Sequence, residues 1–146
     1  MYSNLENISS HINKLSKDDW ERLFALIPEI EKTKTFIKSG GIIEDSNDPD
    51  SFIITPVIEK EIVWDLESVL NDLNLLIAFN WAEWNEGREI ATKQKFENQD
   101  TITLLKLISA FIRNNRFCDG ALAEKFEDRS IEKILTQIKK NIENIK

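Results

Sequence analysis

The sequence has 146 residues and a formal net charge of −7, with 41% hydrophobic and 31% charged residues. This length is enough for one domain to bury a core without disulfides or metals, and the composition excludes wholesale disorder. The acidic balance argues against a general nucleic-acid binder, because such proteins gain affinity from clustered Lys and Arg. We therefore expect one domain over residues 1–146 and no nucleic-acid partner.

Cys118 is the only cysteine and His11 the only histidine. One cysteine cannot form a disulfide within the chain, and these two residues cannot assemble a zinc site of Cys and His ligands. The N-terminus lacks a basic segment followed by an apolar stretch, and no run of about 18 apolar residues occurs. We therefore expect a cytoplasmic protein with no membrane segment, no metal and no cofactor.

The first part of the chain follows a helical period. Apolar residues from Leu5 to Leu15 recur every three or four positions, which predicts a peripheral helix within 1–15. Ser16 and Asp19 have the spacing of a capping box and predict the start of a second helix. Pro28 lacks an amide hydrogen, so we expect a kink or a fresh helix start there.

The middle of the chain begins with a break. Gly40-Gly41 and the polar residues after them predict a loop over 40–51, and the apolar residues 52–55, cut by Pro56, predict one short extended segment. The helical period then returns over 57–76. Apolar residues lie on two faces of that segment, with Trp64 almost opposite the main stripe, which is typical of an inner helix.

Four further helices are expected. Asn80, Asp100 and Ser130 are suited to cap helices over 81–92, 100–113 and 130–145, and a short helix is expected over 120–126. Residues 100–113 are apolar almost all round the helix, which favours a central position. The chain is therefore predicted to be all-α, a compact single-domain helical bundle of about five to seven helices with 57–76 and 100–113 at its centre.

A basic stripe follows the helix over 100–113. Thr103, Lys106 and Arg113 share one face, and Arg116 extends the stripe beyond the helix end. It is either a surface for a carboxylate, phosphate or acidic partner segment, or a set of cations that reach solvent or pair with acids of the chain. The acids considered are Glu83, Glu86 and Glu89.

The segment after Arg116 holds Phe117, Cys118, Asp119 and Gly120. A nucleophilic cysteine needs a nearby base or a lowered thiol pKa, and the only histidine is far off in sequence. The structural interpretation, which we favour, is that Asp119 caps the next helix, Phe117 and Cys118 fill the core, and Arg116 ties the turn to a neighbouring carboxylate.

Trp81, Trp84 and Arg88 share a helix face because they are spaced by three and four residues. They form either a partly exposed aromatic patch with a cation beside it, as at binding hot spots, or core residues with indole nitrogens bonded at the edge. Glu83 and Glu86 could act together as acid and base, although no spacing distinguishes them from a solvated helix face.

The sequence resembles a bacterial family of domains of unknown function, from about Trp20 to Leu135. The residues that carry the resemblance are a Phe-x-Trp-x-x-Trp segment over 79–84 and an Arg-Phe-Cys-acid-Gly box over 116–120. The acid of the box is more often Glu in that family and is Asp119 here, and Asn80 stands where Asp is expected. The resemblance implies a small cytoplasmic helical domain and brings no activity with it.

The leading functional hypothesis is a non-enzymatic binding or regulatory module with an unknown protein partner or a small anionic ligand. Its contact residues would be Trp81, Trp84, Arg88, Lys106, Arg113 and Arg116. A second hypothesis is a small-molecule hydrolase or transferase with a pocket of Arg113, Arg116, Glu83 and Asp119. A third is a structural homodimer through the apolar seam of the last helix, which runs from Ile131 to Ile145 at near-heptad spacing.

Overall fold

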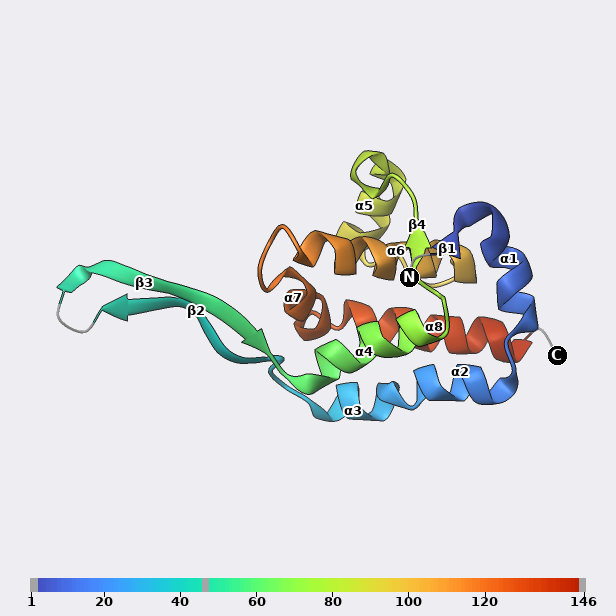
Figure 1. Cartoon of the computed structure of the whole chain (residues 1–146), viewed down its shortest axis with the longest axis horizontal. Helices are drawn as coiled ribbons and strands as arrows, with labels where there is room; N and C mark the ends of the chain where they lie inside the picture. Colours follow the sequence, from blue (N-terminus) through green and yellow to red (C-terminus); the bar gives the residue numbers. More distant parts are fainter. Residues whose placement is uncertain (1–2, 46–47, 145–146) are drawn as a thin grey trace.

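The computed structural model describes residues 3–45 and 48–144, which form a helical bundle with one β-hairpin projecting from it (Figure 1). The described elements are β1 Ser3–Asn4, α1 Leu5–Lys14, α2 Lys17–Phe24, α3 Leu26–Lys32, β2 Ile37–Asp45, β3 Asp48–Glu59, α4 Glu61–Asp72, β4 Ile77–Ala78, the 3-10 turn η1 Trp81–Glu83, α5 Asn85–Lys93, α6 Thr101–Asn115, α7 Ala121–Glu127 and α8 Ser130–Asn144.

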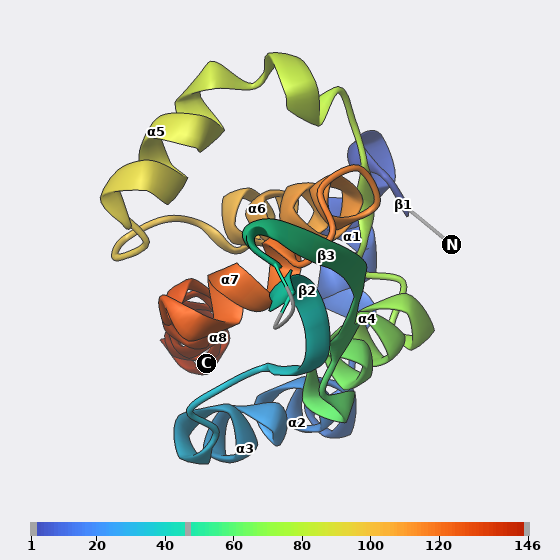
Figure 2. The same cartoon turned by 90° about the vertical axis from the view of Figure 1, so that its left-hand side faces the viewer.

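The core lies where α8 packs against α2, α3, α6 and α7 (Figures 1 and 2). The apolar seam of α8 fills this centre, since Ile131, Ile134, Leu135 and Ile138 are fully buried. The prediction of a helical bundle is therefore confirmed. The seam packs within the chain, so these four residues are not available as a surface for a second copy.

Helix starts in the first half follow the predicted capping residues. The Ser16 hydroxyl accepts from the amide of Asp19, whose carboxylate in turn accepts from the amide of Ser16, which completes the capping box. Pro28 lies in the first turn of α3, where a missing amide hydrogen costs no helical hydrogen bond. The fresh start predicted near Pro28 is confirmed, and it adds one helix to the bundle.

The hairpin is the main difference from the prediction. Over its described residues the loop expected at 40–51 is wrong, because β2 and β3 form an antiparallel pair through 40–45 and 48–51, with Ile42 opposite Ile54 and Ile43 opposite Ile53. Positions 46–47 of the expected loop lie outside the described residues. The extended segment expected over 52–55 is confirmed as part of β3. The hairpin is held together by backbone hydrogen bonds between its two strands. Such bonds do not require a periodic pattern of apolar residues, so the sequence gives no signal for them.

The helix predicted over 57–76 is shorter in the structure. Residues 57–59 belong to β3, and α4 ends at Asp72 before a turn in which Asn74 has a φ of 55°. The predicted second inner face is wrong, since Trp64 is 55% exposed. Leu75 is fully buried, but it lies beyond the end of the helix.

Of the three helix caps predicted in the second half of the chain, the structure has one and lacks the other two. Asp100 caps α6 as predicted, accepting from the amide of Thr103 at 2.7 Å. Asn80 precedes η1 but makes no side-chain cap there. Ser130 is the first residue of α8, where it is fully buried, and its own amide donates to the carboxylate of Asp128.

Candidate binding pocket between α5 and α6

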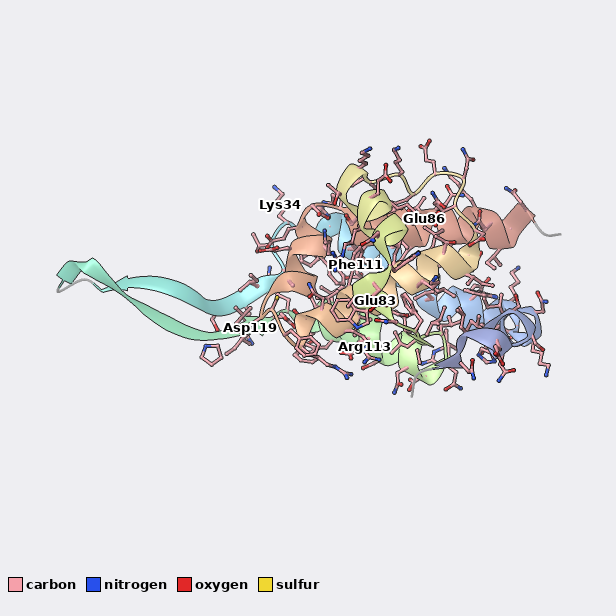
Figure 3. All side chains as sticks on the ribbon, turned by 90° about the horizontal axis from the view of Figure 1, so that it is seen from above. Lys34, Glu83, Glu86, Phe111, Arg113 and Asp119 are labelled. Atoms are coloured by element: carbon pink, nitrogen blue, oxygen red, sulfur yellow. The ribbon has the colours of Figure 1, made fainter. Side chains whose placement is uncertain are left out.

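A pocket of about 340 Å³ lies between α5 and α6, and we call it the α5–α6 pocket. Three aromatic residues line it, Trp81, Trp84 and Phe111, and Figure 3 labels Phe111 in the middle of the bundle. The rest of its lining is made of Gly87, Arg88, Ala91, Thr92, Leu107, Ala110, Asn114 and Lys125. Its volume is at the lower end of the range for small-molecule sites.

Close packing fixes Trp84 at the edge of this pocket. Its ring meets Phe79 edge to face, with centroids 5.4 Å apart, and the ammonium of Lys106 lies 4.1 Å from the indole centroid. A Cβ atom at Gly87 would collide with the same indole ring, so glycine at this position lets the Trp84 ring fold over the first turn of α5, the helix that Trp84 directly precedes. Lys106 therefore holds the aromatic segment onto α6 through cation–π contacts.

Two cations from different helices line the α5–α6 pocket. The guanidinium of Arg88, on α5, donates to the carbonyl of Ala82 at 2.6 Å and is thereby held beside η1. The ammonium of Lys125, on α7, lies 5.2 Å from the Phe111 centroid and 3.8 Å from the Asp128 carboxylate. Both side chains are positioned by neighbours while they line the cavity.

The charge of the α5–α6 pocket differs from that of the whole chain. Its described lining contains Arg88 and Lys125 and no carboxylate, although the chain has a net charge of −7. Two larger hollows mix charges: one beside α1, α2 and α8 includes Glu21 and Glu143 with two lysines, and the other includes three glutamates with three lysines. The α5–α6 pocket is therefore the cavity of these three that favours an anion.

The box over 116–120 anchors the hairpin base, which we define as residues 37–40 and 56–59. The Asp119 carboxylate accepts from the amide of Val57 at 2.8 Å, and Gly120 approaches the Val57 side chain (Figure 3 labels Asp119 at this place). Asp119 therefore does not cap α7 as predicted, since Gly120 precedes that helix with a φ of 85° and no side-chain cap forms.

Phe117 and Cys118 are also placed differently from the prediction. Both are exposed, Phe117 by 76%, so neither fills the core. The Phe117 ring lies 6.2 Å from that of Trp81, which extends the aromatic surface from the α5–α6 pocket toward the box. Arg116 does pair with a carboxylate as predicted, that of Glu67 on α4 at 3.8 Å.

Glu59 is a buried acid beside this anchor. It is 6% exposed, and one carboxylate oxygen accepts from the side-chain amide nitrogen of Asn115 at 3.2 Å while the other has no hydrogen-bond partner. Burial raises the pKa of Glu59, the Asn115 hydrogen bond lowers it, and the negative charges of Asp119 and Glu67 raise it. The net effect is a pKa above the ordinary value of 4.5.

The structure thus brings together part of the predicted contact surface. Trp81, Trp84 and Arg88 line one pocket, and Lys106 packs behind Trp84. Arg113 is half-buried in the last turn of α6, and Arg116 lies against α4, so neither is among the lining residues.

Sequence reasoning missed three contributors to these sites. Phe111 belongs to the apolar pattern over 100–113, which predicts only a central helix, and nothing in the sequence marks Lys125 as a pocket residue or Asn115 as the partner of Glu59. Phe79 and its spacing to Trp84 were visible in the sequence. No local signal could have pointed to Lys125, because α7 reaches the pocket only through tertiary packing.

Comparison with known proteins shows which family the chain belongs to. The model described as "Family of unknown function (DUF6508)" matches residues 15–144. The chain belongs to this family. The resemblance to a family of unknown function is thereby confirmed. No curated protein and no solved structure matches the DUF6508 chain.

Two further findings concern what the described residues contain. None of their helices combines the length and the apolar character needed to cross a bilayer. Among the same residues, no group of three or more His, Cys, Asp or Glu side chains is arranged to hold a metal ion.

Proposed function

We propose that this DUF6508 protein is a non-enzymatic binding module that takes a small anionic molecule with a flat apolar body in the α5–α6 pocket. The single observation that carries the proposal is the lining: three aromatic rings and two cations, with no carboxylate among the described residues. Its one cysteine is unpaired and exposed, which is typical of a reducing compartment, and we therefore place its action in the bacterial cytoplasm.

The physical argument combines the two kinds of lining residue. The flat body of a ligand would lie against the rings of Trp81 and Phe111, which supply apolar area. Its anionic group would meet Arg88 or Lys125; no carboxylate is among the described lining residues, and the Asp128 carboxylate, 3.8 Å from the Lys125 ammonium, lies outside that lining. Such a separation of apolar and charged contacts is the usual design of a small-molecule site.

The enzymatic alternative receives no support from a specific observation. Its pocket requires Arg113, Arg116, Glu83 and Asp119 side by side, and none of the four lines the α5–α6 pocket. Asp119 is bonded to the hairpin base, and Arg116 is paired with α4. We therefore do not propose a reaction.

The indole N–H signals of the four tryptophans offer a direct test by NMR. Benzoate serves as the anionic probe, and benzyl alcohol and benzylamine serve as neutral and cationic probes of similar size. We expect benzoate to shift the signals of Trp81 and Trp84 with a dissociation constant in about the millimolar range, as for other fragments of this size. Trp20, which is buried, and Trp64, on α4, should not respond.

Charge variants sharpen the test. Lys125→Gln should weaken benzoate binding several-fold, and Lys140→Gln, on the exposed side of α8, should leave it unchanged. Equal shifts with benzyl alcohol would show that the anion plays no part. Benzoate shifts spread over all four tryptophans, or absent from Trp81 and Trp84, would rule out the α5–α6 pocket as the site.

A further inference from the structure

An exposed aromatic ring lies next to the α5–α6 pocket. Phe117 is 76% exposed, which is the largest exposed fraction among the large apolar side chains that the structure describes. It is not one of the residues that line the pocket. Its ring nevertheless lies 6.2 Å from that of Trp81, which does line the pocket. Trp81 is therefore shared between the pocket and an apolar surface outside it.

Residues of the pocket fix the backbone at both of these rings. Asn114 lines the pocket in the last turn of α6, and its carbonyl accepts from the amides of Phe117 at 3.0 Å and of Cys118 at 2.9 Å. The carbonyl of Trp81, in η1, accepts from the amide of Trp84 at 3.3 Å. A ligand would therefore meet the two rings with little further ordering of the chain, which lowers the entropy cost of binding.

The size of the α5–α6 pocket favours a ligand that extends beyond it. A volume of about 340 Å³ holds only a small molecule, and a small molecule has few atoms with which to gain affinity. Covering the ring of Phe117 would remove further apolar surface from water, which is favourable. A second apolar group on the same ligand gains this contact without a second loss of translational freedom.

We propose that the ligand of the α5–α6 pocket is a small anion with two apolar groups, the first inside the pocket against Trp81 and Phe111, and the second outside it on the ring of Phe117. The inference rests on the proposed function, which assigns the anionic group and the first apolar group. Phe117 is then the residue that distinguishes such a ligand from a smaller anion. Supporting Trp81 alone would not need a ring so exposed, because only the part of Phe117 that touches Trp81 contributes to that packing.

Two probe ligands that differ by one ring test the contact with Phe117. 4-Methoxybenzoate and 4-benzyloxybenzoate share the carboxylate, the first ring and the ether oxygen, and only the second carries a further phenyl group. Both should shift the indole N–H signals of Trp81 and Trp84, and 4-benzyloxybenzoate should bind about tenfold more tightly because its phenyl group covers apolar surface. Nuclear Overhauser contacts should join that phenyl group to the ring of Phe117.

Phe117→Ser should remove most of this tenfold gain and leave the affinity for 4-methoxybenzoate unchanged, because only the second ring reaches position 117. Trp64→Ser is the matched control, since it removes an aromatic ring that is 55% exposed on α4 and belongs to no proposed site. The control variant should keep the gain. Circular dichroism should show that both variants keep their helices, as expected for exposed positions.

The outcomes separate this inference from the proposed function. If neither probe shifts the signals of Trp81 and Trp84, the pocket itself is wrong and the inference falls with it. If 4-methoxybenzoate binds there but the second phenyl group adds no affinity, or if the gain survives in Phe117→Ser, the pocket stands and the inference is overturned. Equal weakening of both probes by Phe117→Ser also overturns it, and would show that Phe117 only supports the Trp81 ring.

Discussion

Ser109 shows how one hydroxyl joins two segments of the core. It is 1% exposed, donates to the carbonyl of Leu105 at 2.8 Å, and accepts from the amide of Ile77 at 2.9 Å. Ile77 belongs to β4, whose backbone would otherwise be buried with an unpaired donor. The hydroxyl therefore satisfies a buried donor of β4 while it also bonds its own helix.

Replacing Ser109 by Ala should lower the free energy of unfolding by about 1–3 kcal/mol, the usual cost of an unsatisfied buried donor. Thr136→Val is the matched control, because the Thr136 hydroxyl makes the same bond to a carbonyl four residues earlier, that of Glu132, and accepts none from the residues that the structure describes. Chemical denaturation measures both. Equal losses in the two variants would show that the Ile77 contact contributes nothing.

Glu59 makes stability depend on pH with a definite sign. Its pKa in the folded protein is above the ordinary 4.5, so the folded state binds this proton more tightly than the unfolded chain. The stabilisation is complete below about pH 4.5 and is lost as the pH rises through the folded-state pKa. At neutral pH the carboxylate is therefore a buried charge with one unpaired oxygen.

Glu59→Gln should remove that dependence. At pH 4 the variant and the unchanged protein should have similar unfolding free energies, and by pH 7 the variant should be the more stable by on the order of 1 kcal/mol. Denaturation curves between these two pH values measure the change. Glu61→Gln, exposed at the start of α4, should show no such trend. If the unfolding free energies of Glu59→Gln and the unchanged protein differ by the same amount at every pH, the raised pKa of Glu59 is contradicted.

Residue roles were predictable from the sequence where the partner is local. Ser16 with Asp19, and Asp100 with Thr103, bond within three residues, and both caps were identified. Asp119 was misassigned because its partner, Val57, lies 62 positions away. Its place before a helix suggested a cap, and only tertiary packing brings the hairpin base to its carboxylate.

At the scale of elements, Asp119 fastens the hairpin to the bundle. Asp119→Ala should leave the Val57 amide without its partner and increase hydrogen exchange at residues 57–59, with little effect on the slow-exchanging amides of α6 and α8. Cys118→Ala, at the exposed neighbouring position, should leave exchange unchanged. If these amides exchange as slowly in the Asp119 variant as in the unchanged protein, other contacts hold the hairpin base.

The position of the Trp84 ring over the first turn of α5 depends on Gly87. Gly87→Ala should displace the indole, lower stability by about 1–3 kcal/mol through overpacking, and abolish the benzoate response of Trp84. Asn85→Ala, exposed on the same helix, serves as control and should retain the response. Normal benzoate binding with Ala at position 87 would mean that the pocket does not require this packing.

The helices could be predicted because each buries a periodic face, and the hairpin could not because it buries little against the bundle. From the sequence, Gly40 was expected to end a helical region. In the structure it has a φ of 97° and lies where β2 passes close to the carbonyl of Pro56. Pro49 and Pro56 argued against a long strand in the sequence, yet both lie within β3. Of the residues that line the α5–α6 pocket, only those in the segment of η1 and α5 could be predicted from the sequence.

At the scale of the whole molecule, the hairpin and the bundle should be separable. Replacing residues 41–55 by an Asn-Gly turn would join Gly40 to Pro56, which are neighbours in space. The helical body should keep its circular dichroism and lose less than about 1 kcal/mol at low protein concentration, because few contacts link it to the removed residues. Loss of cooperative unfolding in this shortened chain would contradict the separation.

The segment before residue 15 lies outside the family match, yet it completes the fold. Ile8 is fully buried, β1 pairs with β4 in parallel, and the His11 ring nitrogen contacts the carbonyl of Leu73 at 2.7 Å, 62 positions away. At about 5–20 residues per second, a ribosome needs roughly 3–12 s to make the intervening chain. The α1 segment therefore cannot make these contacts until residues 73–78 have been synthesised, and during those seconds its apolar side is open to chaperones.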